Sequence, residues 1–368
     1  MIYLDNAATT LVKPAVVEKA VITAMRSMAS PGRGGHIPAM KAAETVYDCR
    51  CAAAELFHME DAERVVFTMN ATHGLNIAIA SMAKRGTKTV ISGFEHNSVT
   101  RPLNAIGAEV TVAGRSLFDR EAVLEDFKRK IPSAELVVCT HVSNVFGFIL
   151  PVYEIAELCC SYSVPLIVDA SQSAGVLPVD MERLGAAFVA MPGHKALFGP
   201  QGTGILLCGE EGKPLMHGGS GSNSISQFMP DFLPDRLEAG THNVCGIAGL
   251  KAGIEYISYK GLDKILAHEK KLLRIMLKQL EGGPFELFSG DENSQCGVLS
   301  LRCQNDDCER IAAELGARGI CVRSGLHCAP TAHESAGTVK TGTVRFSFSP
   351  FTTETQVRAA CAALKEIV

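Results

Sequence analysis

The feature that most constrains the fold is an alternation of short β-rich runs with helical segments. The runs RVVFT, KTVISG, AEVTVAG, ELVVCTHV, VPLIVDAS, AAFVAMP and TGILLC lie at 64–68, 88–93, 108–114, 135–142, 164–171, 186–192 and 203–208. Segments with helical periodicity separate several of them, at 71–82, 120–130 and 152–160. This alternation predicts a mostly parallel sheet with helices on both faces. The continuous apolar runs at 138–141 and 165–169 fit strands that are buried on both sides.

Near residue 245 the pattern changes. Two long helical patterns follow, at 244–261 and 262–280, and the remaining residues mix β-rich runs with helices. This mixture predicts a smaller α+β domain, which the first residues can join because chain ends often lie close together. We therefore expect an α/β fold with a large domain at residues 15-250 and a small domain formed by residues 1-14 and 251-368.

Composition narrows the class of protein. The 368 residues carry a formal net charge of -4 without a basic block, which argues against nucleic-acid binding. No apolar run reaches the roughly 18 residues of a membrane span. The start MIYLDNAATT does not resemble a signal peptide, so we expect a cytoplasmic location. The 13 cysteines form no CxxC pair and no zinc spacing, so most are interpreted as small buried residues and no metal site is predicted.

The stretch AMPGHKALFG at 190–199 places Lys195 in a turn directly after an apolar run. In an open α/β sheet, ligands bind outside the carboxyl ends of the strands. Lys195 is either a solvated surface residue or an amine in a pocket, where desolvation favours Schiff-base formation. Asp169 in VDASQ is either a helix N-cap or the partner of a cation at the end of a buried strand. A lysine and an acid that pairs a protonated pyridine nitrogen are the minimal set for pyridoxal phosphate.

Further turns follow other predicted strands. TMNATHGLN at 68–76 brings small residues to the start of a helix, which suits a phosphate held by backbone N–H groups, although many such turns look similar. FEHNS at 94–98 and HVSNVFG at 141–147 supply His96 and Asn144. For a lone histidine after a strand, a purely structural role also remains open.

The last segments add a thiol and a cation. RSGLHCAP at 323–330 puts Cys328 beside His327 in a loop bounded by glycine and proline. Such a loop can be mobile and exposed, and a thiol near a cationic group ionises more easily; a buried loop cysteine is the alternative. Arg345 lies inside a β-rich run, where a buried arginine needs an anionic partner such as a substrate carboxylate.

Together these motifs resemble the class V aminotransferase-like enzymes and, among them, the cysteine desulfurases. The resemblance runs from YLDNAATT at residue 3 to VRFSFSPFTT ending at residue 353, with each motif in the expected order. It implies the fold type I of pyridoxal phosphate-dependent transferases. The loop RSGLHCA is similar to the RTGHHCA-like loop of one desulfurase branch, with Leu326 in place of one histidine.

The resemblance implies roles for the matching residues. Lys195 would hold pyridoxal 5'-phosphate as a Schiff base, and Asp169 would pair with the pyridine nitrogen. His96 would stack on the ring face. Cys328 would be the nucleophile that receives sulfur.

It also implies the contacts around the ring and the substrate. Gln172 and Asn144 would lie at the ring hydroxyl. Arg345 would bind the substrate carboxylate, with Asn144 and Ala7 beside the substrate. The remaining cofactor contacts would come from Ala71, Thr72, His73 and His194 and, across a homodimer with shared sites, from Thr241 of the neighbouring subunit.

The activity implied is removal of sulfur from L-cysteine, giving L-alanine and a persulfide on Cys328 for transfer to an acceptor protein or a small thiol. Two alternatives use the same cofactor: a lyase acting on L-selenocysteine, and a β-lyase that yields pyruvate. A non-catalytic scaffold is the alternative from a different class. An aminotransferase would leave Cys328 without a task.

Overall fold

The structure is a computed structural model that describes residues 1–32, 34–222, 224–303 and 307–368. Within these ranges its large sheet has seven strands in the order β2-β8-β7-β6-β5-β3-β4. They are β2 (Val65–Thr68), β3 (Lys88–Ser92), β4 (Glu109–Ala113), β5 (Leu136–Thr140), β6 (Leu166–Asp169), β7 (Phe188–Pro192) and β8 (Gly204–Cys208). Strands β4, β3, β5, β6 and β7 are parallel, and β8 runs antiparallel to both β7 and β2. The predicted mostly parallel sheet is confirmed.

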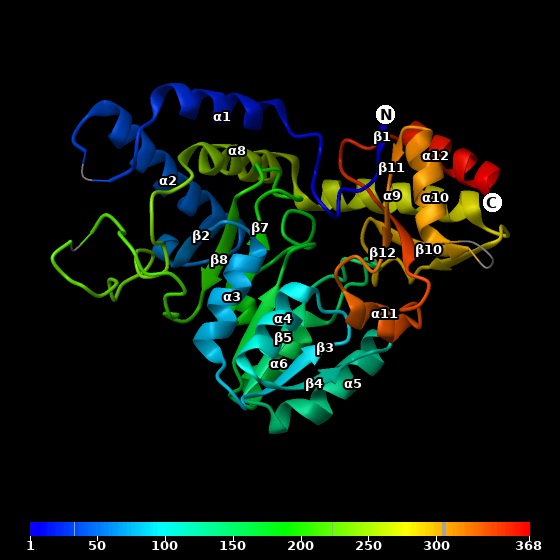
Figure 1. Cartoon of the computed structure of the whole chain (residues 1–368), viewed down its shortest axis with the longest axis horizontal. Coiled ribbons are helices and arrows are strands. Elements are labelled where there is room, and N and C mark those ends of the chain that lie inside the picture. Colours follow the sequence, from blue (N-terminus) through cyan, green and yellow to red (C-terminus); the bar gives the residue numbers. More distant parts are fainter. Residues whose placement is uncertain (33, 223, 304–306) are drawn as a thin grey trace.

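Helices cover both faces of this sheet (Figure 1). Along β6, Ile167 belongs to one buried apolar cluster, whereas Leu166 and Val168 belong to another, as expected from the two-residue period of a strand. The first cluster includes residues of α3 (Ala71–Met82) and α4 (Asn97–Ile106). The second includes residues of α1 (Ala15–Ser27), α2 (Ile37–Leu56), α5 (Arg120–Lys130), α6 (Val152–Ser161), α7 (Met181–Leu184) and α8 (Val244–Lys260). Short 3-10 turns lie at Ala62–Arg64 and Ile131–Ser133.

A second, antiparallel sheet follows in the C-terminal part, with the order β12-β13-β10-β9. Its strands are β9 (Phe285–Phe288), β10 (Val298–Cys303), β12 (Arg323–Gly325) and β13 (Thr343–Ser347). Residues of α9 (Leu262–Leu280), α10 (Cys308–Ala317) and α12 (Glu354–Ile367) pack with strands β10 and β13 into a separate buried cluster. The helix α11 (Pro330–Ala336) directly follows the Cys328 loop.

The start of the chain lies against this second sheet (Figure 1). Strand β1 (Ile2–Tyr3) pairs in parallel with β11 (Ile320–Cys321), and Leu4 is part of the C-terminal cluster. We therefore propose residues 1-14 and 251-368 as the small domain and residues 15-250 as the large one.

Two features bear on the expectations from composition. Among the residues described, none of the helices combines the length and the apolar character needed to cross a bilayer. Within the described ranges the cysteines form no disulfide; eight are buried, and Cys160 and Cys328 are the exposed ones. The interpretation of most cysteines as small buried residues is confirmed.

Candidate active site

The carboxyl ends of β5, β6 and β7 border a cavity of about 200 Å³. For scale, an apolar protein cavity of about 150 Å³ accepts a benzene ring, so this cavity has room for one small aromatic ring. Most residues singled out in the sequence line it together: Ala7, Ala71, Thr72, His96, Asn144, Asp169, Gln172, His194, Lys195 and Arg345. They come from both domains and from opposite ends of the chain.

Lys195 is placed by a tight turn after β7. A side chain at Gly193 would collide with the hydroxyl of Thr203, so the chain needs glycine at the start of this turn. The carbonyl of Gly193 accepts a hydrogen bond from the N–H of Gly199 at 2.7 Å, which closes the turn. Burial lowers the pKa of the Lys195 ammonium to about 8, although Asp169 opposes the shift. The amine is therefore closer to its neutral, nucleophilic form than a surface lysine.

Asp169 is the last residue of β6, and 3% of its surface is exposed. Its Oδ1 accepts a hydrogen bond from the N–H of Ser171 at 2.9 Å. A turn follows rather than a helix, so the alternative that Asp169 is a helix N-cap is wrong. Its carboxylate lies close enough to Lys195 to raise the pKa of the ammonium.

The N-terminus of α3 forms the next side of the cavity. Asn70 caps the helix by accepting the N–H of His73 at 2.9 Å, and Thr72 Oγ1 lies 2.8 Å from Ser98 Oγ. Ala71 and Thr72 line the cavity, where the helix N-terminus favours an anion. His73 lines a neighbouring hollow of about 180 Å³ instead.

Thr241 lines that neighbouring hollow too, away from the Lys195 cavity of its own chain. The sequence places it on the cofactor of a second subunit. The assignment of Thr241 to the cofactor of a second subunit stays a prediction.

Three further polar residues of the cavity, His96, Gln172 and His194, form hydrogen-bond contacts with other groups of the chain. His96 caps α4, with Nδ1 at 2.8 Å from Ser98 Oγ, and burial lowers the pKa of its imidazole to about 4. It is therefore neutral at pH 7. Gln172 Nε2 donates to the carbonyl of Ala7 at 3.0 Å, and His194 Nδ1 lies 3.0 Å from Thr9 Oγ1.

Arg345 closes the far end of the cavity, and only 1% of its surface is exposed. Its Nη2 donates to Asp5 Oδ1 at 2.7 Å and its Nη1 to the carbonyl of Asn144 at 3.0 Å. Its Nε is buried without a hydrogen-bond partner among the described residues. The carboxylate of Asp5 is therefore the anionic partner of the buried Arg345 guanidinium. A substrate carboxylate would be a second anion bound by the same guanidinium.

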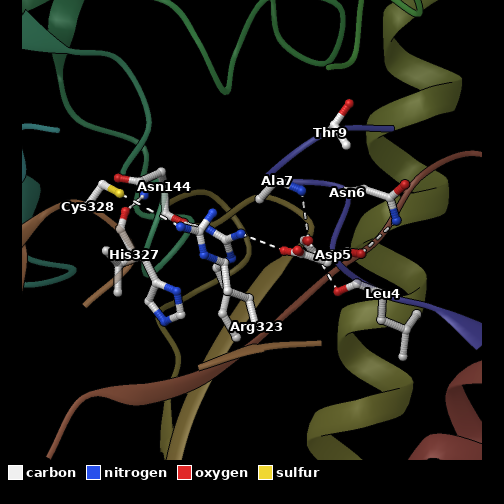
Figure 2. Close-up of polar contacts among 12 residues, drawn as sticks. Leu4, Asp5, Asn6, Ala7, Thr9, Asn144, Arg323, His327 and Cys328 are labelled. Carbon is white, nitrogen blue, oxygen red and sulfur yellow. Dashed lines mark hydrogen bonds and ion pairs between the residues drawn. The ribbon is translucent and has the colours of Figure 1, made fainter. Parts of the chain in front are cut away.

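Arg323 also lines the cavity and was not singled out from the sequence. It faces Arg345 across the β12–β13 pair. Its Nη2 lies 3.7 Å from the sulfur of Cys328, as Figure 2 shows. Arg323 is the first residue of the motif RSGLHCAP, so the sequence did contain a cation near Cys328. That this arginine reaches the thiol follows only from the pairing of β12 with β13.

Cys328 is exposed beside the cavity and is held by its backbone. His327 and Cys328 have φ angles of 49° and 56°, a left-handed conformation that is uncommon outside glycine. The carbonyl of Cys328 accepts the N–H of Asn97 at 2.8 Å, and the carbonyl of His327 accepts Asn144 Nδ2 at 2.8 Å. Figure 2 shows Asn144 beside His327 and Cys328. The Cys328 side chain is thus exposed, which agrees with one of the two interpretations of this loop, whereas His327 is buried. Hydrogen bonds to the backbone anchor both residues.

His327 is not the cation beside the thiol. Its side chain is buried with Nε2 at 3.0 Å from Thr343 Oγ1, and burial lowers the pKa of its imidazole to about 2. The cationic group beside the thiol of Cys328 is Arg323.

A larger hollow of about 970 Å³ lies elsewhere, lined by Ala54, Met59, Pro165, Met181, Glu182 and neighbouring residues. It contains none of the residues singled out above. The smaller cavity is the candidate site because a lysine, a carboxylate, histidines and arginines converge there.

Comparison with known proteins agrees with this geometry. Residues 2–359 match the family described as Aminotransferase class-V. A probable cysteine desulfurase of Methanothermobacter thermautotrophicus is 32% identical over 100% of this chain and 94% of its own length. The chain belongs to the cysteine desulfurase family. It is therefore an enzyme of this kind.

Further relatives extend the comparison. A cysteine desulfurase of Escherichia coli O157:H7 is 32% identical over 89% of this chain and 84% of its own length. The apo structure of a cysteine desulfurase from Thermococcus onnurineus superimposes with a TM-score of 0.91 at 32% identity, covering 100% of this chain and 94% of the other. The fold type I expected from the sequence is confirmed.

Proposed function

We propose that this enzyme is a pyridoxal phosphate-dependent cysteine desulfurase that converts L-cysteine to L-alanine and takes the sulfur onto Cys328 as a persulfide. The observation that carries the proposal is the position of an exposed thiol, with Arg323 beside it, next to a cavity that holds Lys195 and Asp169. A nucleophile, a Schiff-base lysine and a buried acid are thus within one site.

The residues present fit pyridoxal phosphate. The N-terminus of α3 offers backbone N–H groups and the Thr72 hydroxyl to a phosphate. Asp169 is a carboxylate with 3% exposure, which suits a protonated pyridine nitrogen. When bound, the cofactor supplies an electron sink for the electrons of a substrate bond.

The chain's own groups divide the remaining work. Lys195, with its pKa lowered to about 8, takes the Cα proton of the substrate. His96 is neutral and presents its ring to the cofactor without adding charge. Arg345 holds the substrate carboxylate and fixes which Cα bond faces Lys195.

Sulfur transfer falls to Cys328. Its thiolate, with Arg323 beside it, attacks the substrate sulfur. The new S–S bond forms while the Cβ–S bond breaks, and its electrons pass to the carbon skeleton. Protonation of that skeleton gives alanine, so L-cysteine and the thiol become L-alanine and a persulfide without an external oxidant.

We propose a homodimer in which Thr241 reaches the phosphate bound in the partner. Apolar side chains of the same region support an interface: Met216, Ile225, Phe228 and Phe232 are exposed. The free thiols fit a reducing compartment such as the cytoplasm, where a protein or a small thiol accepts the sulfur.

The test is the carbon product formed from L-cysteine in the presence of a reducing agent. Alanine, together with a persulfide on Cys328 located by mass spectrometry, is the expected result. Pyruvate as the main product would replace this proposal with β-elimination. Much faster turnover of L-selenocysteine than of L-cysteine would assign the enzyme as a selenocysteine lyase.

A further inference from the structure

A second buried carboxyl lies behind the cavity wall. Glu95 sits in the turn between β3 and α4, directly before His96, and its surface is 0% exposed. It does not line the cavity itself. Burial of a carboxyl is costly without hydrogen bonds, so its contacts indicate what it is for.

Those contacts join two neighbouring strand ends. Glu95 Oε1 accepts the backbone N–H of Thr140 at 2.7 Å and also a short hydrogen bond from the hydroxyl of Ser92. Ser92 ends β3 and Thr140 ends β5, and these strands are paired. The other oxygen, Oε2, is buried without a hydrogen-bond partner among the described residues.

The two strand ends carry the ring-binding side chains. Thr140 is paired in register with Asp169, and its hydroxyl lies 3.4 Å from the Asp169 carbonyl. At the end of β3, Glu95 directly precedes His96 in the sequence, so the position of its side chain constrains that of His96. Building on the proposed function, we propose that Glu95 is a positioning residue that joins the ends of β3 and β5 and so holds His96 and Asp169 in place around the cofactor ring.

The hydrogen bonds also fix the state of this carboxyl. Two donors point at Oε1 and none at Oε2, so a proton on Oε2 leaves every contact intact. Burial raises the pKa of Glu95 to about 8, with Asp169 adding to the shift against the hydrogen bonds from Ser92 and Thr140. The other titratable group near it is Cys139 on β5. Burial raises the pKa of the Cys139 thiol, so this group stays neutral. Glu95 is therefore mainly a neutral acid at pH 7.

Two substitutions separate positioning from charge. Glu95→Gln keeps an oxygen that accepts both hydrogen bonds, whereas Glu95→Ala removes the link between the strands. We expect Glu95→Ala to weaken pyridoxal phosphate binding about tenfold or more, by the loss of two buried hydrogen bonds, and to shift the visible absorption of the bound cofactor. Glu95→Gln should bind the cofactor within about twofold of the wild type at pH 7.

The pH dependence supplies a second readout. Between pH 7 and 9 the wild-type carboxyl ionises, so the absorption and the affinity of the bound cofactor change, whereas Glu95→Gln lacks this change. In the cofactor-free protein, the folded pKa of about 8 exceeds the ordinary value of 4.5, so stability falls as pH rises from 4.5 to about 8 and levels off above that. Glu95→Gln should flatten this fall, and this measurement needs no cofactor.

Glu269 is the matched control. It is buried on α9, where burial raises its pKa to about 8, and it belongs to the hollow beside Gln172 and Lys195 rather than to the ends of β3 and β5. Glu269→Gln should flatten the stability profile too, and because glutamine keeps the size of the side chain, it should change cofactor absorption much less than Glu95→Ala does. Unchanged affinity and absorption in Glu95→Ala would overturn the proposal, as would an equal spectral change in Glu269→Gln. If no variant bound pyridoxal phosphate, the proposed function would fail, and the cofactor-free stability profiles would still test the link.

Discussion

Lys195 and Cys328 both lie in tight turns, but the two turns differ in the strand that precedes them and in the backbone conformation that they require. Lys195 follows a fully buried strand of the large sheet, in a turn that requires Gly193. Cys328 follows a short strand of the small domain, and two non-glycine residues there adopt left-handed backbone angles. The lysine is enclosed where desolvation tunes it, whereas the thiol is exposed where a partner can reach it. The comparison teaches that cofactor chemistry and sulfur export need opposite degrees of burial within one site.

The largest expected effect lies on the enclosed side. Replacing Lys195 with alanine should lower alanine formation from L-cysteine by about 100- to 10,000-fold, because the general base and the Schiff-base amine are both lost. Steady-state assays of alanine measure it. Activity within tenfold of the wild type would show that another group takes the proton.

Replacement of the exposed thiol should block a different step, the transfer of sulfur to the protein. Cys328→Ala should retain cofactor absorption but form no protein persulfide, because the thiolate that attacks the substrate sulfur is gone. Mass spectrometry after a single turnover measures the persulfide. Cys160→Ala is the control, since Cys160 is the other exposed thiol in the described part of the chain. Persulfide formed by Cys328→Ala at the wild-type rate would refute the assignment.

Arg345 lies between the two sides. Replacing it with glutamine should raise KM for L-cysteine about 10- to 100-fold, because a charge-assisted hydrogen bond to the substrate carboxylate is lost. Arg345→Lys should restore little, since an ammonium cannot form the paired contacts of a guanidinium. An unchanged KM in both variants would move carboxylate binding elsewhere, with Arg323 as the next residue to test.

The smallest effect is expected at Arg323, because its contact with Cys328 is exposed to solvent. Arg323→Gln should slow alkylation of Cys328 by iodoacetamide several-fold at neutral pH, since the thiolate loses a nearby cation. Arg323→Lys should recover part of the rate. Alkylation of Cys160 in the same sample is the internal reference, and an unaltered ratio between the two thiols would contradict the role of Arg323.

Local sequence patterns were sufficient to locate the enclosed side, but they left the roles of Lys195 and Asp169 open. The apolar runs with polar ends predicted the sheet and brought Asp169 and Lys195 to one edge, because parallel strands all end on the same side. The roles of His96, Asn144 and Arg345 needed the ordered motifs of a family, since each has an ordinary structural explanation when taken singly.

The exposed side could not be predicted from local patterns. The contact of Arg323 with Cys328 depends on the register of β12 against β13, and the anchors of the loop come from Asn97 and Asn144 in the other domain. Burial, which makes His327 neutral rather than a cation, is likewise a property of the assembled fold. The sequence suggested a mobile loop, and the structure adds hydrogen bonds that anchor it.

The ion pair between Asp5 and Arg345 joins positions that are 340 residues apart. A ribosome adds about 5–20 residues per second, so the first strand of the chain waits tens of seconds for its partner to be made. Until then the large sheet can form, but the substrate end of the site cannot. The polypeptide therefore gains its full set of reactive groups only after Arg345 has been made, and chains that stop before residue 323 lack the exposed thiol together with its cationic neighbours.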